Sequence, residues 1–254
     1  MERITSRKNP LAVHMKKLGT SRSYRDETGE FLCDGIKLLE DAVRSETVVT
    51  NILTSSGIPF PLSLDTHVYY AQRSLIDSLS PLKNSQDILF TCKIKKDADV
   101  AANRYSGGVS LILDNMQDPG NVGTIIRTAN AFGVQTVILY GGCADPYNPK
   151  TIRASMGSIF RQNIIYKEIQ DLQKIKEEGV RFIGASLSGA DSDIRSIGQS
   201  GIIIAIGSEG QGLSEQILSL CDEIMSIPIA KECESLNAAA AAAIFIWESR
   251  KCRM

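Results

Sequence analysis

The chain has 254 residues, which is enough for one large domain or two modest ones with substantial cores. Its composition, 43% hydrophobic and 22% charged, is typical of a globular protein, and no apolar run approaches the roughly 18 residues that cross a bilayer. The net charge of −1 indicates no general affinity for nucleic acid. The amino terminus lacks the layout of a signal peptide, so no membrane is expected as a partner and a cytoplasmic location is expected.

The six cysteines are scattered, without a C-x-x-C pair, and the sequence has only two histidines. Such a distribution indicates neither a zinc site nor a disulfide framework. Reduced, mostly buried thiols are the simpler interpretation, and we expect no metal.

Charge is unevenly distributed along the chain. Residues 1–25 contain seven basic side chains and one acidic one, a net charge of +6, while the remainder carries −7. Because phosphate attraction acts over about one Debye length, roughly 8–10 Å, a local basic segment is sufficient for contact with nucleic acid. From the charges alone, a solvated amphipathic helix explains residues 1–25 as well as a nucleic-acid contact does.

The first hundred residues predict a small α/β unit. Apolar residues at helical spacing indicate helices, and runs of β-branched residues indicate strands. A short helix is expected to start near residue 73 and to stop at Pro81. The polar segment 95–108, which closes with two glycines, is the predicted linker. The other predicted elements are a helical face within 29–43 and strands at 47–55, 67–72 and 87–94.

From residue 109 onward, strands and helices alternate. Near-continuous Val, Ile and Leu strands alternating with helices predict a mostly parallel sheet that is covered on both faces. The predicted strands are 109–115, 136–141, 163–167, 181–187, 201–207 and 223–229. The predicted helices are 121–133, 149–160, 171–179, 213–221 and the alanine-rich segment at the end.

The stretch "LDNMQDPGNVGTIIRTANAFG" (113–133) leads from a strand through a Pro-Gly turn into a helix. Asn121 is expected near the helix start, where a simple cap would explain it. Arg127 lies about two turns further on among apolar residues, and a surface salt bridge is its ordinary explanation. Ligands of open α/β sheets bind beyond the carboxyl ends of strands, so both side chains are also candidates for a site.

The stretch "IIIAIGSEGQGLSEQI" (202–217) joins a buried strand to a helix through a glycine-rich loop. Gly207, Gly210 and Gly212 permit close backbone approach or a tight turn. The loop has neither the Lys-Ser/Thr of a phosphate loop nor dinucleotide-fingerprint spacing, and Glu209 would repel a pyrophosphate. A kinase or a nucleotide-dependent oxidoreductase is therefore disfavoured.

The stretch "SIPIAKECESLNAAAAAA" (226–243) leads from a strand into the last helix. Pro228 lacks a backbone N–H, so the strand ends or lies at an edge there. Either Ser235 or Asn237 is a good helix cap. The six alanines that follow allow the helix to pack unusually close to its neighbour.

In this order, "NVGTIIR", "GSEGQGLS" and "IPIAKECESLN" resemble the motifs of the SpoU (TrmH-like) family of RNA 2′-O-ribose methyltransferases, within the SPOUT superfamily. The front of the chain, with "ITSRKNP" and "YRDETGEFLCDGIKLLEDA", is similar to the L30e-like substrate-binding domain of ribosomal-RNA members. The resemblance implies an L30e-like α/β domain at 1–100. It also implies a methyltransferase domain at 101–254, with an α/β fold whose end threads a deep trefoil knot.

The same resemblance implies S-adenosylmethionine as cofactor, RNA as substrate and a homodimer with its site near the subunit interface. Lys231 departs from the family pattern, because many relatives have glycine there. Carried over by position, the functional polar residues are Asn121, Arg127, Glu209, Ser235 and Asn237, and the cofactor-binding residues are Gly207, Ser208, Ile227, Ile229 and Leu236. The expected RNA-binding residues of the front domain are Arg3, Arg7, Lys8, Arg22 and Arg25.

Methyl transfer to a ribose hydroxyl requires in-line geometry, loss of the hydroxyl proton and stabilisation of the developing alkoxide. We expect Arg127 to stabilise charge and orient the substrate rather than act as base, because a guanidinium stays protonated in proteins. Asn121, Ser235 and Asn237 are expected to fix the geometry by hydrogen bonds. Glu209 is expected to orient Arg127 or a neighbouring loop.

Two alternatives remain open. A transfer-RNA methyltransferase would carry the same motifs, and only the L30e-like front half favours ribosomal RNA, by analogy. A non-catalytic RNA-binding assembly factor is disfavoured because all five functional polar residues are present. In the last helix, Ala240→Leu is expected to harm folding or cofactor binding more than a surface substitution would.

Overall fold

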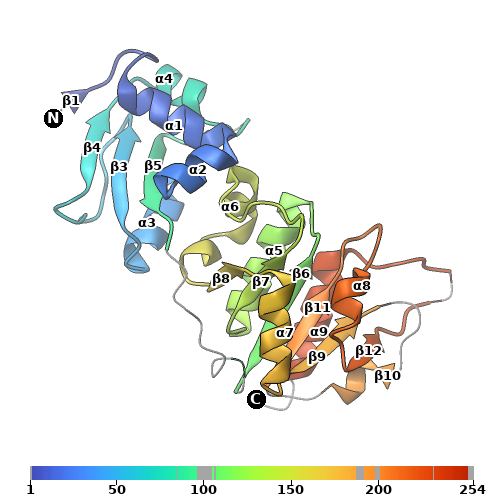
Figure 1. Ribbon diagram of the computed structural model, residues 1–254. Coiled ribbons are helices and arrows are strands. Elements are labelled where there is room, and N and C mark those ends of the chain that lie inside the picture. The colour runs from blue at the N-terminus through green and yellow to red at the C-terminus, as the bar shows by residue number, and fades with distance from the viewer. Residues whose placement is uncertain are drawn as a thin grey trace. The chain divides into compact units, whose positions relative to one another are not determined.

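The computed structural model describes residues 2–83, 85–95, 105, 107–186, 192–197, 201–230 and 232–250. The chain forms two compact units, one of Met1–Lys96 with Asp145–Arg161 and the other of Asp97–Ala144 with Gln162–Met254 (Figure 1). Most of the predicted linker at 95–108 and the last residue of the strand predicted at 181–187 lie outside the described residues. No helix in the described ranges is long and apolar enough to cross a membrane.

The first unit contains a mixed five-stranded sheet with the order β1-β4-β3-β5-β2. β4 runs parallel to β1 and β3, whereas β5 runs antiparallel to β2 and β3. The strands are β1 Glu2–Arg3, β2 Glu30–Asp34, β3 Val49–Thr54, β4 His67–Tyr70 and β5 Ile88–Lys93. The helices are α1 Pro10–Thr20, α2 Arg22–Thr28, α3 Ile36–Arg44, α4 Arg73–Leu79 and α6 Pro149–Ser155, with a 3₁₀ turn at Ser158–Phe160.

The predicted strands of this unit are confirmed, but the segment 29–43 is more than a helix. Gly29 ends α2 at a φ of 63°, β2 follows, and only then does α3 begin. The sequence interpretation merged β2 with the helix because Phe31, Leu32 and Cys33 are all buried and show no strand alternation.

Helix α1 follows from local sequence signals. The Asn9 side chain accepts a hydrogen bond from the Leu11 backbone N–H at 2.9 Å, and Pro10 occupies the first helical position. Ala12, Met15 and Leu18 form its buried face, which packs in one core with strand residues of β2, β3 and β5. The basic residues of α1 are therefore left on the solvent side.

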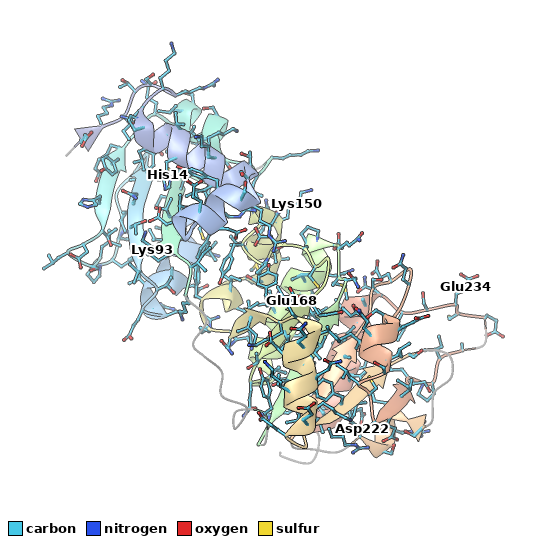
Figure 2. All side chains as sticks on the ribbon, in the orientation of Figure 1. His14, Lys93, Lys150, Glu168, Asp222 and Glu234 are labelled. Atoms are coloured by element: carbon cyan, nitrogen blue, oxygen red, sulfur yellow. The ribbon has the colours of Figure 1, made fainter. Side chains whose placement is uncertain are left out.

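A buried carboxylate ties α1 to the sheet. Glu30 is only 7% exposed, and its two oxygens accept from His14 Nε2 at 2.8 Å and Lys93 Nζ at 2.9 Å. Both partners are labelled in Figure 2. Burial by itself raises the pKa of Glu30, but the hydrogen bonds from Lys93 and His14 outweigh it, so the pKa lies below its usual range.

The second unit contains a seven-stranded sheet in which every strand pair is parallel, as the sequence predicts. Its order is β10-β12-β9-β11-β6-β7-β8. The strands are β6 Val109–Asp114, β7 Val137–Tyr140, β8 Ile164–Tyr166, β9 Arg181–Ala185, β10 Ser192–Asp193, β11 Ile202–Ile206 and β12 Glu223–Ser226. The helices are α5 Pro119–Ala131, α7 Ile169–Glu177, α8 Glu215–Leu218 and α9 Ala238–Arg250, with a 3₁₀ turn at Ile194–Ser196.

The six predicted strands of this unit are all present, and β10 was missed because it has two residues. α7 and α8 contribute Leu172, Ile175 and Ile217 to one core cluster on the sheet, whereas α9 packs against α5 and β11. Parallel strands end at one edge, so the segments that follow β6, β11 and β12 are brought together there. The trefoil knot and the L30e-like character of the first unit stay predictions.

The alanines of α9 divide into several environments. Ala238, Ala239 and Ala242 are buried, whereas Ala240 is exposed. The prediction that Ala240 is sensitive to packing is therefore wrong, because its side chain is exposed.

Glu30→Gln should lower the free energy of unfolding at pH 7 by about 1.5–3 kcal/mol, since hydrogen bonds to a charged group are lost. The folded-state pKa of Glu30 is lowered, so its contribution is present above the unfolded value of about 4.3 and is lost as pH falls through the folded value. Urea unfolding of both proteins at pH 7 and below pH 4 measures the effect. The difference in the free energy of unfolding between Glu30→Gln and wild type should be smaller in acid. Glu27→Gln, an exposed neighbour on α2, is the matched control, and equal effects of the two substitutions would contradict the assignment.

Candidate functional site

Three segments meet at one carboxylate. Glu209, in the loop after β11, accepts through Oε1 from Asn121 Nδ2 of α5 at 2.8 Å and from Asn237 Nδ2 at 2.6 Å. Asn237 Nδ2 also donates to Asn121 Oδ1 at 3.1 Å. We call these three residues the amide–carboxylate cluster. It joins the stretches 113–133, 202–217 and 226–243, which carry the three sequence motifs.

Asn121 enters the cluster because it is not the cap of α5. Asp118 is the cap, and its Oδ1 accepts from the Asn121 backbone N–H at 2.7 Å, with Pro119 in the first turn. The predicted capping role of Asn121 is therefore wrong. Its side chain, which has no helix end to satisfy, reaches Glu209 instead.

Asn237 performs two tasks at once. Its Oδ1 accepts from the backbone N–H groups of Ala239 at 3.0 Å and Ala240 at 3.2 Å, which caps α9. Its Nδ2 is then directed to Glu209 and Asn121. Because the helix fixes which amide atom is the acceptor, the donor orientation within the cluster is also fixed.

A cavity of about 580 Å³ adjoins the cluster. Glu209 and Ser235 line it, together with apolar side chains such as Ile224 and Leu213. Of the residues expected to bind a cofactor, Gly207, Ser208, Ile227 and Leu236 line the cavity and Ile229 does not.

The glycine-rich loop forms one wall through its backbone. Ser208 and Gly212 exchange backbone hydrogen bonds of 3.1 and 2.9 Å, so the loop doubles back on itself. A Cβ atom at Gly207 would lie 2.1 Å from the Gly212 carbonyl carbon, a distance that no side chain tolerates. Gly207 is required by this close approach, whereas Gly212 is required by its φ of 67°.

The cavity also takes its shape from α9. Ala238 and Ala241 line it, and their short side chains leave the space that larger residues would fill. This gives the alanine-rich sequence a function beyond close packing.

The charge of the cavity restricts what it can hold. Among the lining residues, Glu209 alone carries a charge, and Lys231 lies outside the described part of the chain. A phosphate-bearing ligand would meet no cation on these walls, whereas a ligand with a positive centre would be attracted to Glu209. No group of three or more His, Cys, Asp and Glu side chains in the described residues could hold a metal ion.

Arg127 stands apart from the cavity. Its side chain is exposed on α5, it does not line the cavity, and it forms no hydrogen bond or ion pair with any residue that the structure describes. The expected contact with Glu209 is absent, because Asn121 and Asn237 occupy that carboxylate. Arg127 is therefore available to an external ligand.

Asp114 is a site residue that the sequence interpretation missed. It ends β6, is fully buried and accepts from the Ser214 backbone N–H at 2.6 Å and from Asn115 Nδ2 at 2.7 Å. The first bond fastens the end of the glycine-rich loop to the neighbouring strand. An acidic residue at the carboxyl end of a buried strand was the available signal.

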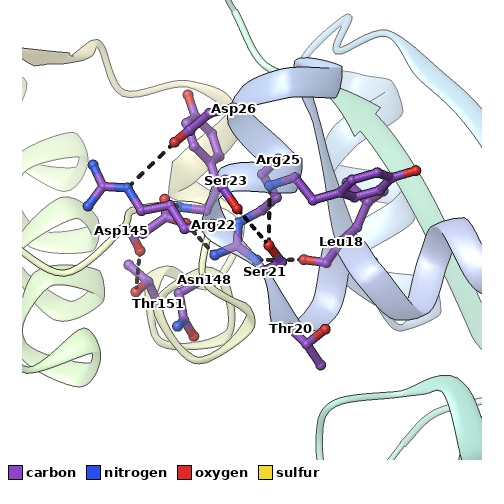
Figure 3. Close-up of polar contacts among 12 residues, drawn as sticks. Leu18, Thr20, Ser21, Arg22, Ser23, Arg25, Asp26, Asp145, Asn148 and Thr151 are labelled. Carbon is purple, nitrogen blue, oxygen red and sulfur yellow. Dashed lines mark hydrogen bonds and ion pairs between the residues drawn. The ribbon is translucent and has the colours of Figure 1, made fainter.

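The predicted RNA-binding residues fall into two groups. Arg3, Arg7, Lys8 and Arg22 are exposed in the first unit. Arg25 is only 3% exposed, and it donates from Nε to Asp145 Oδ2 at 2.8 Å and from Nη1 to the Leu18 carbonyl at 2.6 Å (Figure 3). Its assignment to RNA is corrected, because its guanidinium is buried in an internal ion pair.

Comparison with known proteins agrees with this arrangement. The profile of the SpoU rRNA Methylase family matches residues 108–247. A relative from Bacillus subtilis strain 168, 23S rRNA (guanosine(2553)-2′-O)-methyltransferase RlmP, is 32% identical over 98% of this chain and 100% of its own length. A 23S rRNA (uridine(2479)-2′-O)-methyltransferase from Streptomyces viridochromogenes is 29% identical over 99% of this chain and 93% of its own.

Solved structures extend the likeness to three dimensions. The AdoMet-bound rRNA methyltransferase from Sinorhizobium meliloti has a TM-score of 0.87 and 27% identity, covering 100% of this chain and 98% of that one. The methyltransferase AviRb from Streptomyces viridochromogenes, in complex with the cofactor AdoMet, has a TM-score of 0.83 and 26% identity, covering 97% of this chain and 98% of that one. The chain belongs to the SpoU rRNA methylase family.

Proposed function

We propose that this protein transfers a methyl group from S-adenosylmethionine to a ribose 2′-hydroxyl of ribosomal RNA. The cavity beside the amide–carboxylate cluster carries the proposal. Among the described residues that line this cavity, only Glu209 is charged. The names of the relatives from Bacillus subtilis and Streptomyces viridochromogenes support the reaction and the substrate class.

The residues that line the cavity fit the cofactor. S-adenosylmethionine supplies an electrophilic methyl group on a positively charged sulfur. Ile227, Leu236 and the backbone at Gly207 and Ser208 would hold its uncharged nucleoside part, and Glu209 would face a positive centre. Ala241 leaves room for the ligand.

Arg127 is our candidate for the residue that meets the reacting ribose. Its exposed guanidinium can bind the 2′-oxygen and a neighbouring phosphate, and it stabilises the developing alkoxide as a fixed positive charge. Because a guanidinium does not release its proton, a phosphate or water takes the hydroxyl proton. Asn121 and Asn237 hold the surrounding segments through the amide–carboxylate cluster, and Ser235 on the cavity wall offers its hydroxyl to a ligand.

In this proposal residues 1–100 form the RNA-binding domain and residues 101–254 the methyltransferase domain, of which Asp145–Arg161 belongs to the first compact unit. Arg3, Arg7, Lys8 and Arg22 contact phosphates and 2′-hydroxyls of folded RNA. The enzyme works in the cytoplasm as a homodimer, with its site near the interface, and sedimentation analysis at micromolar concentration would measure the assembly.

Arg127→Ala should lower kcat for RNA methylation about 10²–10³-fold, because the charge that stabilises the alkoxide is removed. Transfer of a labelled methyl group to rRNA from cells that lack the enzyme measures the rate. S-adenosylmethionine binding should be unchanged by calorimetry, since Arg127 does not line the cavity. Arg195→Ala, another exposed arginine of the second unit, is the control, and a near-wild-type rate for Arg127→Ala would end the assignment.

Ala241→Leu should weaken S-adenosylmethionine binding by about tenfold or more, because the larger side chain fills the cavity. Calorimetric titration measures the affinity, and the melting temperature should change little. Ala240→Leu, one position away and exposed, should bind like wild type. Equal affinity of the two variants would argue against this cavity as the cofactor site, and wild-type protein that binds no cofactor would favour a non-catalytic assembly factor.

Replacing Arg3, Arg7 and Lys8 together by alanine should reduce the salt dependence of RNA binding. Each lost phosphate contact reduces the magnitude of the slope of log K against log salt by about 0.7–0.9, so three lost contacts reduce it by about 2–3. Fluorescence anisotropy with labelled rRNA fragments between 50 and 200 mM salt, roughly the range over which such effects are large, gives the slope. Lys174→Ala, exposed on α7 of the second unit, is the control, and an unchanged slope in the triple variant would reject the interface.

A further inference from the structure

The first unit contains a second cavity, of about 340 Å³. Its walls come from β2, the start of α3, the segment after α4 and helix α6. Leu32, Leu38, Leu82 and Ile152 provide apolar surface, and Met156 lies at the wall as well. The volume is at the lower end of the roughly 300–1,000 Å³ that small-ligand sites occupy.

Both signs of charge line this cavity. Lys37, Asp41 and Arg153 contribute to its walls, and none of their side chains forms a hydrogen bond or an ion pair within 4 Å with a residue in the described ranges, although the charge of Arg153 acts on Asp34. Asp34 differs, because it accepts from Ser80 Oγ at 2.6 Å and from the Gln86 backbone N–H at 2.8 Å. Two cations and one carboxylate are thus available to a ligand.

Met156 gives an independent indication. Its φ of 47° belongs to the left-handed cap that ends α6, and its side chain is 62% exposed at the edge of the cavity. The thioether therefore remains in water beside an apolar cavity. Thioethers make favourable contacts with aromatic rings, which identifies a flat aromatic group as a suitable partner.

We propose that this cavity binds one unstacked nucleobase of the RNA substrate, a base that carries an exocyclic amino group. The amino group donates to Asp41, the apolar walls and Met156 cover the ring, and Lys37 and Arg153 bind the adjoining phosphates. Sequence-specific recognition of RNA commonly uses bases that are splayed out in this way. The inference rests on the proposed function, because it takes RNA as the substrate.

The site can be tested without methyl transfer. Full-length protein with ¹³C-methyl methionine is titrated with CMP and with UMP, and the Met156 signal is assigned through Met156→Leu. CMP should shift the Met156 methyl signal, and UMP, which lacks the amino group, should shift it less. Asp41→Asn should remove the preference for CMP. No shift of Met156 with either nucleotide, or equal shifts in wild type, overturns the proposal.

A second measurement connects the cavity to RNA. Leu38→Trp, which fills the cavity, should raise the KM for rRNA about tenfold, equivalent to about 1.4 kcal/mol, with S-adenosylmethionine affinity and melting temperature kept. Leu64→Trp, at a fully exposed position of the same unit, is the matched control. An unchanged KM in Leu38→Trp overturns the proposal. Wild-type protein that binds CMP but methylates no rRNA would instead refute the proposed function, so the two failures are distinguishable.

Discussion

The Glu209 carboxylate holds together three segments that are far apart in the chain. It accepts from Asn121 and Asn237, whose side chains come from the start of α5 and the start of α9. Neither amide can compensate a negative charge fully, so the carboxylate remains the electrostatic centre of a cavity whose other described wall residues are uncharged. The arrangement of the segments around the cavity and the charge inside it thus depend on the same group.

The parallel sheet explains why this assembly is possible. β6, β11 and β12 end at one edge, and the loops that follow them meet there. Asp114 adds a fastening between the first two, since its buried carboxylate accepts from the Ser214 backbone. The strands therefore hold both ends of the glycine-rich loop in place. The loop doubles back at Gly207, and it needs few side-chain contacts of its own.

Much of the architecture could be predicted, because Val- and Ile-rich strands with intervening helices specify a parallel sheet. The errors have local causes. β2 does not stand out in the sequence because its residues are buried without alternation, and Asn121 resembles a cap although the Asp118-Pro119 pair is the stronger start signal. Sequence patterns predict the burial of individual side chains less well than they predict helices and strands. Arg25 belongs to the basic segment of the sequence, which predicts contact with RNA. In the folded chain it is buried and paired with Asp145, which lies 120 residues away in the sequence.

Asn237 imposes a chemical restriction on its own position. One atom of its side chain must accept from the helix, and the other must donate to Glu209. Aspartate would cap α9 equally well but would set two like charges against each other, and serine would cap it without offering a second arm. A carboxamide of this length is the one ordinary side chain that meets both demands. A single substitution at Asn237 would therefore change both the stability of the last helix and the electrostatics of the cavity.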